Sequence, residues 1–204
     1  MSPRARWLAR LLLAAASATV ACEEPVDRFA RPTGVAFGSD GDVFVADGYE
    51  HSRIVRFDEE GRFVAAWGER GVGPGQLEVP HGIAADGRGR VYVADRANAR
   101  VQVFDEDGGV IDVWDDPILG RPWHVALAPN GRVWVLDGGD QDPERPRTRV
   151  LELSADGEVL SVFDASASDP PIVHTGHALA VGADGSVYVA DLEGQRVVKL
   201  EVRR

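Results

Sequence analysis

Two histidines occupy equivalent places in a pattern that the chain repeats. Four segments share a short apolar run that ends in an aspartate: Asp47, Asp95, Asp137 and Asp191. The residues 14 positions before these aspartates are Thr33, His81, Trp123 and His177. Neutral imidazole is a common ligand of zinc and related ions. If the fold arranges the repeats around one axis, His81 and His177 are therefore candidate metal ligands.

Two histidines are few for a metal site, because a catalytic zinc usually has three protein ligands and a water molecule. His124 and His174 are candidate replacement ligands, although His124 is offset from the repeated position by one residue and His174 by three. The alternative is that His81 and His177 lie in a channel and bond to the backbone or to water.

The residues around each aspartate predict the elements that position the histidines. A shorter apolar segment and a Gly-containing turn precede each aspartate strand, and a strand led by an arginine follows it. These arginines are Arg53, Arg100, Arg149 and Arg196. Because the aspartates and arginines recur in every repeat, we interpret them as scaffold, forming turn caps and inter-strand ion pairs.

Four short alternating strands per repeat, joined by Asp-Gly or Asn-Gly turns, are typical of β-propeller blades. We predict an all-β propeller with four blades of four antiparallel strands, at about residues 32–68, 79–115, 121–164 and 174–202. The last repeat lacks its fourth strand. We expect "VDRFA", residues 26–30, to pair with it and close the ring, since this would cover an exposed sheet edge. A ring closed in this way is expected to be a monomer.

Residues 1–21 have the plan of a bacterial secretion signal. Three arginines precede "LLLAAASATVAC", an apolar run too short to span a bilayer. "TVAC" resembles a lipobox, which makes Cys22 the predicted lipidation site and residues 22–31 an anchor segment that includes the closing strand. We expect a lipoprotein of the bacterial cell envelope. The alternative is an ordinary cleavage site beside a chance cysteine, with a periplasmic or secreted product.

The charge of the chain excludes some partners. The formal net charge is −11, and removal of the arginine-rich leader makes it more negative. Such a chain repels phosphate backbones and anionic lipid headgroups. We therefore expect no nucleic-acid partner, and membrane contact only through the lipid anchor. Cys22 is the single cysteine of the sequence, so an intramolecular disulfide is impossible.

The repeats resemble the NHL family over almost all of the chain after the leader. The runs "DGYEHSRIV", "PGQLEVPHG" and "ADRANARVQVF" are similar to the catalytic domain of peptidyl-α-hydroxyglycine α-amidating lyases, also called peptidylamidoglycolate lyases. "HTGHALAVGADGSVYVAD" continues the similarity. The resemblance implies cleavage of a peptide that ends in α-hydroxyglycine into a peptide amide and glyoxylate, with a metal held by three channel histidines.

The resemblance also assigns roles to four residues. His81 and His177 match two of the three metal ligands, which implies zinc or a similar divalent ion. Tyr49 matches the proposed general base, and Arg96 matches an arginine that holds the substrate carboxylate. These types suit the chemistry, because a metal lowers the pKa of a bound hydroxyl and the planar guanidinium binds both carboxylate oxygens. Without the resemblance, Tyr49 would be a packed loop aromatic and Arg96 a solvated arginine.

The chain departs from the family in two places. The family's N-terminal blades, which carry the first metal histidine and a second catalytic arginine, have no counterpart before Pro32. The acidic residue that follows the last metal histidine in the family, and helps to hold a structural calcium there, is replaced by Ala178. Calcium binding is therefore in doubt, and part of the lyase site has no matching residue.

Three hypotheses of different classes follow. The first is a metal-dependent lyase of the amidating type. The second is a non-catalytic, envelope-anchored propeller that binds a peptide or protein on one face, with the polar connection "GGDQDPERPRTR" as a candidate contact. The third is an incomplete propeller whose open edges cause self-association.

Overall fold

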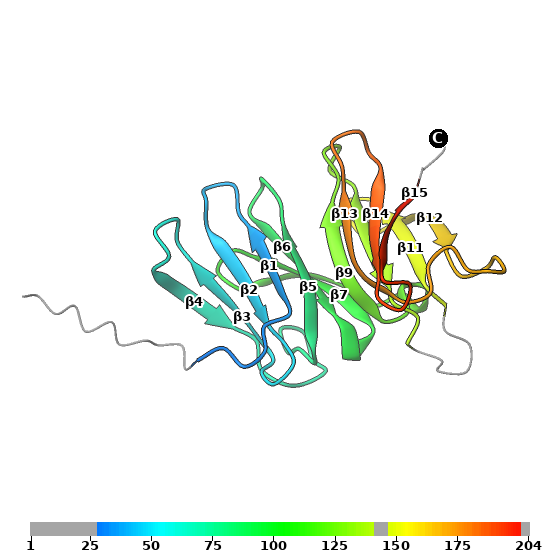
Figure 1. Cartoon of the computed structure of the whole chain (residues 1–204). Coiled ribbons are helices and arrows are strands. Elements are labelled where there is room, and N and C mark those ends of the chain that lie inside the picture. Colours follow the sequence, from blue (N-terminus) through cyan, green and yellow to red (C-terminus); the bar gives the residue numbers. More distant parts are fainter. Residues whose placement is uncertain (1–27, 141–146, 201–204) are drawn as a thin grey trace, which may run out of the picture.

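The computed structural model describes residues 28–140 and 147–200, which fold into four antiparallel sheets, called blades 1 to 4 here (Figure 1). Blade 1 contains β1 (Gly34–Phe37), β2 (Val43–Asp47), β3 (Arg53–Phe57) and β4 (Phe63–Trp67). Blade 2 contains β5 (Pro80–Ala85), β6 (Arg90–Asp95), β7 (Arg100–Asp105) and β8 (Val110–Trp114). Blade 3 contains β9 (Pro122–Leu127), β10 (Val133–Asp137), β11 (Arg149–Leu153) and β12 (Val159–Asp164). Blade 4 contains β13 (Gly176–Val181), β14 (Val187–Asp191) and β15 (Arg196–Leu200).

Within each blade the strands pair in the order of the sequence. The helical segments of the described residues are two single turns of 3₁₀-helix, η1 (Arg96–Asn98) and η2 (Pro117–Leu119). None of the helices in these residues is long and apolar enough to cross a bilayer. The predicted all-β propeller with four blades is therefore confirmed.

Apolar side chains hold successive blades together. The inner strands β1, β5, β9 and β13 contact one another in this order. Between each pair of blades, the two facing sheets bury a cluster of alternating strand residues, as the period-two pattern requires. Members of these clusters include Phe44 and Phe104 between blades 1 and 2, Tyr92 and Leu151 between blades 2 and 3, and Trp134 and Leu179 between blades 3 and 4.

The recurring aspartates and arginines form the predicted ion pairs inside each blade. The Arg–Asp distances are 3.1 Å for Arg53–Asp47, 2.8 Å for Arg100–Asp95, 2.6 Å for Arg149–Asp137 and 3.3 Å for Arg196–Asp191. The same carboxylates also accept backbone N–H groups from the segment just before the inner strand. This places the start of each inner strand, and with it the channel residue of that blade.

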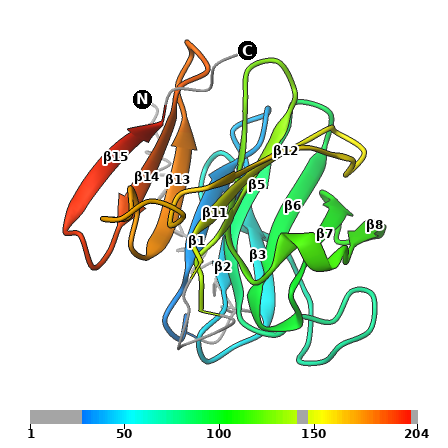
Figure 2. The same cartoon turned by 90° about the vertical axis from the view of Figure 1, so that its right-hand side faces the viewer.

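The predicted closing strand is not found among the described residues. Blade 4 has three strands there, and of residues 26–30 only 28–30 are described, without strand structure. Phe29 instead packs on Phe57 of β3, with ring centroids 6.1 Å apart, within the range of favourable aromatic pairs. Extensive contact between β13 and β1 is also absent in this part of the chain, and Figure 1 shows blade 1 apart from blade 4. Figure 2 shows the molecule from the right-hand side of Figure 1, with blade 4 toward the viewer.

Candidate functional site

His81 lies at the start of β5 with its side chain almost completely buried. Its Nδ1 is 2.8 Å from the carbonyl oxygen of Trp123. A carbonyl only accepts hydrogen bonds, so Nδ1 carries the proton and Nε2 is the acceptor. The hydroxyl of Tyr49, 3.1 Å from Nε2, must then donate to it. Burial lowers the pKa of His81 to about 4, helped by the charges of His177 and Arg96 and opposed by the bond to Trp123, so the imidazole is neutral at pH 7.

Three rings from three blades meet at the channel. The ring centroids of His81, Trp123 and His177 are each 5.1 Å from the other two. They come from β5, β9 and β13, which are the inner strands of blades 2, 3 and 4. The position 14 residues before each repeated aspartate therefore does face the channel. Burial and the nearby charge of Arg96 lower the pKa of His177, which keeps it neutral as well.

Tyr49 reaches His81 because the loop after β2 passes very close to β5. A Cβ atom on Gly48 would lie 1.8 Å from the carbonyl oxygen of Pro80, so this approach requires glycine. The two side chains meet edge to face, with ring centroids 5.6 Å apart. The guanidinium carbon of Arg31 lies over the Tyr49 ring, 5.0 Å from its centroid. Tyr49 is thus partly exposed and contacts both an imidazole and a cation.

Arg96 follows β6 in η1 and stacks on Trp123, with its guanidinium carbon 3.8 Å from the ring centroid. Asp140 joins the two side chains: it accepts from Arg96 Nη2 at 2.6 Å and from Trp123 Nε1 at 2.9 Å. Arg121 lies 3.5 Å from the same carboxylate. Burial acts to raise the pKa of Asp140, but the bonds from Trp123 and Arg96 and the two arginine charges outweigh it and lower the pKa. Two cations therefore share one anion, which leaves a net positive charge beside the histidines.

Of the two proposed replacement ligands, His174 does not join this group, whereas His124 lies near enough to His81 and His177 that, besides burial, charge on one ring lowers the pKa of another. His174 bonds through Nδ1 to Asp191 at 3.2 Å, so it belongs to the scaffold of blade 4. The Nδ1 atom of His124 is buried and has no hydrogen-bond partner among the described residues. Its backbone packs on Gly82 of the neighbouring blade. The predicted lipidation site, Cys22, lies outside the described residues.

The donor set does not fit the three-histidine metal site that the resemblance implies. Within residues 28–140 and 147–200, no three His, Cys, Asp or Glu side chains lie close enough together to hold a metal ion. His81 and His177 are near each other, but the Nε2 atom through which His81 would bind a metal accepts the Tyr49 hydroxyl instead. The third ring of this group is that of Trp123, whose indole is not a metal ligand. Among the described residues the site therefore contains two channel histidines, one of them hydrogen-bonded to Tyr49.

Sequence reasoning found Tyr49, His81, His177 and Arg96 but missed Asp140 and the cations of Arg31 and Arg121. Asp140 begins the long polar connection that the sequence indicated as a rim contact, three residues after the repeated Asp137. Arg31 and Arg121 both stand 16 residues before a repeated aspartate and directly precede a proline. The other two repeats have Val79 and Thr175 at this position, so the repeat does not assign a role to the arginine. A signal was therefore present only for Asp140.

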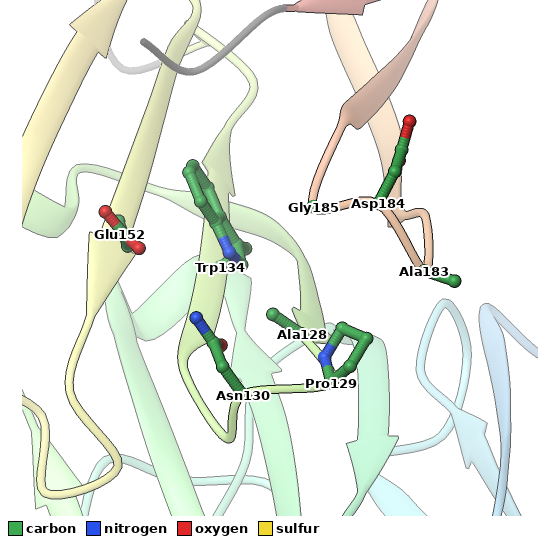
Figure 3. A pocket seen from close by; sticks show the side chains of 8 residues that line it. All are labelled: Ala128, Pro129, Asn130, Trp134, Glu152, Ala183, Asp184 and Gly185. Carbon is green, nitrogen blue, oxygen red and sulfur yellow. The ribbon is translucent and has the colours of Figure 1, made fainter. Parts of the chain in front are cut away.

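A separate cavity of about 240 Å³ lies at the other end of β9 from Trp123 (Figure 3). It is lined by the β9–β10 turn with Pro129 and Asn130, by Trp134 and Glu152, and by Asp184 of the β13–β14 turn. Its lining contains none of the histidines. It is therefore a gap between the turns of blades 3 and 4, distinct from the channel site.

Comparison with known proteins agrees with the repeated pattern. Residues 29–57 and 77–104 match the family model of the NHL repeat. The chain is an NHL-repeat domain. It is 34% identical over 183 residues to peptidyl-glycine alpha-amidating monooxygenase B of Xenopus laevis, covering 84% of this chain and 20% of that protein. It is 31% identical over 186 residues to a probable peptidyl-alpha-hydroxyglycine alpha-amidating lyase of Caenorhabditis elegans, covering 85% and 50%.

This NHL-repeat domain also resembles solved propellers. Virginiamycin B lyase from Staphylococcus aureus superposes with a TM-score of 0.62 at 14% identity, over 86% of this chain and 57% of that one. At that identity the likeness concerns the fold alone. The domain thus spans about a fifth of the monooxygenase and half of the nematode lyase. The relationship to the amidating proteins suggests a metal, but the residues described above do not supply one with three ligands.

Proposed function

We propose that this NHL-repeat domain binds a peptide by its C-terminal carboxylate at the channel. The observation that carries the proposal is the cluster in which Arg96 and Arg121 share Asp140 beside the neutral His81 and His177. A guanidinium binds both oxygens of a carboxylate. The excess positive charge therefore favours an anionic group in a protein that is otherwise strongly acidic.

The donor set favours binding over metal-dependent cleavage. The implied metal would need three ligands, whereas two channel histidines are present and one of them is bonded to Tyr49. A peptide carboxylate needs no metal here, because Arg96 is already oriented by stacking on Trp123. Burial and the charge of this nearby guanidinium lower the pKa of His177, and Tyr49 contacts the neighbouring His81.

Peptide affinity tests the proposal. Calorimetric titration of residues 22–204 should show that a glycine-extended peptide binds and that its C-terminally amidated twin binds at least about tenfold more weakly, as expected for a charge-assisted bond of about 1.5–3 kcal/mol. Arg96→Gln should remove the difference. The matched control is Arg62→Gln, since Arg62 is an exposed arginine that also pairs with an aspartate. Equal affinity for both peptides would refute carboxylate recognition.

Cleavage of peptidyl-α-hydroxyglycine is a second candidate, favoured by the contact between the Tyr49 hydroxyl and His81. In this reaction Tyr49 would pass the hydroxyl proton of the substrate onward while the C–N bond breaks; the amide nitrogen gains a proton and the C–OH carbon becomes the aldehyde of glyoxylate. An assay for glyoxylate, with and without added zinc, separates the candidates. Binding without glyoxylate supports the first, whereas turnover lost in Tyr49→Phe supports the second.

We also propose that the protein is exported and anchored to the cell envelope through lipid on Cys22. The support is the arginine-led apolar leader and the "TVAC" run before this cysteine. An anchored propeller of this kind would present its channel to peptides outside the cytoplasm.

A further inference from the structure

Blade 1 exposes a face that every other blade buries. Val35 of β1 is 56% exposed, whereas the residues at the equivalent position of the next three blades are at most 5% exposed: Ile83, Val125 and Leu179. Each of these equivalents packs on the preceding blade. Phe37, which lies on the same side of β1, is 70% exposed. We call Val35, Phe37 and Val43, the residue that pairs with Phe37, the leading face of blade 1.

The turn before β4 is uncovered in the same way. In blades 2 and 3 the turn glycines Gly108 and Gly157 lie directly under Trp67 and Trp114 of the preceding blade. The equivalent Gly61 of blade 1 has nothing within 4 Å of the Cβ position. The leading face is therefore shaped like the other blade interfaces but lacks a partner among the described residues.

Blade 4 exposes the opposite face. Val197 of β15 is 69% exposed, whereas its equivalents are at most 1% exposed: Ile54, Val101 and Val150. Each of those residues packs on the blade that follows. Tyr188 is 36% exposed, although Phe44, Tyr92 and Trp134 are buried at the same position. We call Tyr188, Ala190 and Val197 the trailing face of blade 4; Ala190 and Val197 are paired across β14 and β15.

The charges beside the two faces match those at the interface between blades 1 and 2. Arg56 on the trailing side of blade 1 lies over Phe44 and bonds to Asp107 in the β7–β8 turn of blade 2 at 3.0 Å. Its equivalent in blade 4 is Lys199, which lies over Tyr188 with 5.9 Å to the ring centroid. The equivalent of Asp107 in blade 1 is Glu60. Within one copy Glu60 pairs with Arg62 at 2.7 Å and Lys199 lies 3.9 Å from Asp184, both at exposed positions. Docking of the trailing face on a leading face would therefore bring Lys199 to Glu60.

We propose that the trailing face of blade 4 docks on the leading face of blade 1 of a second copy of this chain. The same positions already pack together at three interfaces inside the molecule, so the two faces have the shape and side chains of a blade interface. The contact within one chain is not made, because β13 and β1 do not pack extensively in the described structure. Such an interface is head-to-tail, and it closes when the rotation between copies allows. Two copies joined at both ends stay within the roughly 4–8 blades of known propellers.

Sedimentation velocity over a range of concentrations tests the proposal. Residues 22–204 should self-associate, and Val35→Glu and Val197→Glu should each weaken association at least about tenfold, because each buries a charge in an apolar contact. Both positions are exposed within one copy, so the fold should persist in near-ultraviolet circular dichroism. The matched control is Val72→Glu, since Val72 is 74% exposed outside both faces.

Mixing the two variants is the sharper test. Val197→Glu keeps an intact leading face and Val35→Glu keeps an intact trailing face, so an equimolar mixture should form a 1:1 dimer that neither variant forms alone. Lys199→Glu should weaken association and Glu60→Lys should restore it in the double variant. A wild-type protein that stays monomeric, an association unchanged by the variants, or a mixture that stays monomeric would overturn the proposal.

Discussion

The imidazole of His81 combines burial, a fixed tautomer and a phenol partner in one side chain. Its Nδ1 donates to a carbonyl oxygen and its Nε2 accepts from Tyr49. In a protonated His81 both ring nitrogens are donors, so the bond to Tyr49 would reverse, with Nε2–H donating to the phenol oxygen. The direction in which Tyr49 donates to His81 therefore belongs to the neutral imidazole.

Acid should destabilise the protein through His81. Its pKa is lowered from 6.5 to about 4 in the folded state, so the unfolded chain takes up a proton first as the pH falls. The free energy of unfolding should therefore decrease between pH 6.5 and about 4. Urea unfolding at several pH values measures this. His81→Asn, which can still donate to the Trp123 carbonyl, should reduce the dependence and leave the part due to His124, whose pKa burial also lowers to about 4. An unchanged slope in that variant would show that His81 does not titrate as described.

Asp140 competes with any carboxylate ligand for Arg96. Asp140→Asn keeps an oxygen that accepts from Trp123 but removes the competing charge, so affinity for a glycine-extended peptide should rise about 1.4- to 5-fold, the range for a partly exposed pair. Titration calorimetry measures the change. Asp58→Asn alters the net charge equally at a distant exposed turn and should leave affinity unchanged. A loss of affinity in Asp140→Asn would mean that Asp140 contacts the peptide itself.

At the level of single elements, the loop after β2 is held against β5 by the lack of a side chain at Gly48. Gly48→Ala should destabilise the fold by about 1–3 kcal/mol, as overpacking does, and should displace Tyr49 from His81. Chemical unfolding gives the first effect and peptide affinity the second. Gly87→Ala is the control, because a Cβ there meets nothing within 4 Å. If both variants unfold alike, the close approach of Gly48 to Pro80 is not a constraint.

The strands were predictable because each blade repeats the same alternation and the same Asp–Arg pair. The channel position of His81 and His177 followed from the repeat as well. The Tyr49–His81 bond did not, because a loop contact between blades has no periodic signature. The role of Trp123 was equally hidden: counting placed it in the channel, but only the structure shows that it stacks on Arg96 and donates to Asp140.

Across the whole molecule, the sequence predicted the number of blades but not how the ends are covered. A strand such as "VDRFA" satisfies the alternation rule for an edge, yet Phe29 packs on the apolar side of β3. Pattern alone does not distinguish a sheet edge from a sheet face, since both attract alternating apolar residues. The exposed leading and trailing faces therefore emerged only from comparing equivalent positions across blades.

Lipid attachment can be tested on the intact precursor. Cys22→Ser should abolish incorporation of a labelled fatty acid and move the protein from the membrane fraction to the soluble fraction of an expressing bacterium. The leader is unchanged in this variant, so export itself should continue. Membrane association that persists in Cys22→Ser would contradict lipid anchoring at this residue.

The most direct measurement is the imidazole nitrogen spectrum of residues 22–204 at pH 7, recorded by NMR with a glycine-extended peptide and with its amidated twin. We predict that the free protein shows His81 as the Nδ1–H tautomer. The peptide acid should shift the His81 and His177 signals, and the amide should leave them in place. Imidazole signals that stay unchanged with both peptides, or a His81 protonated on Nε2, would contradict a carboxylate site built on the Tyr49–His81 pair.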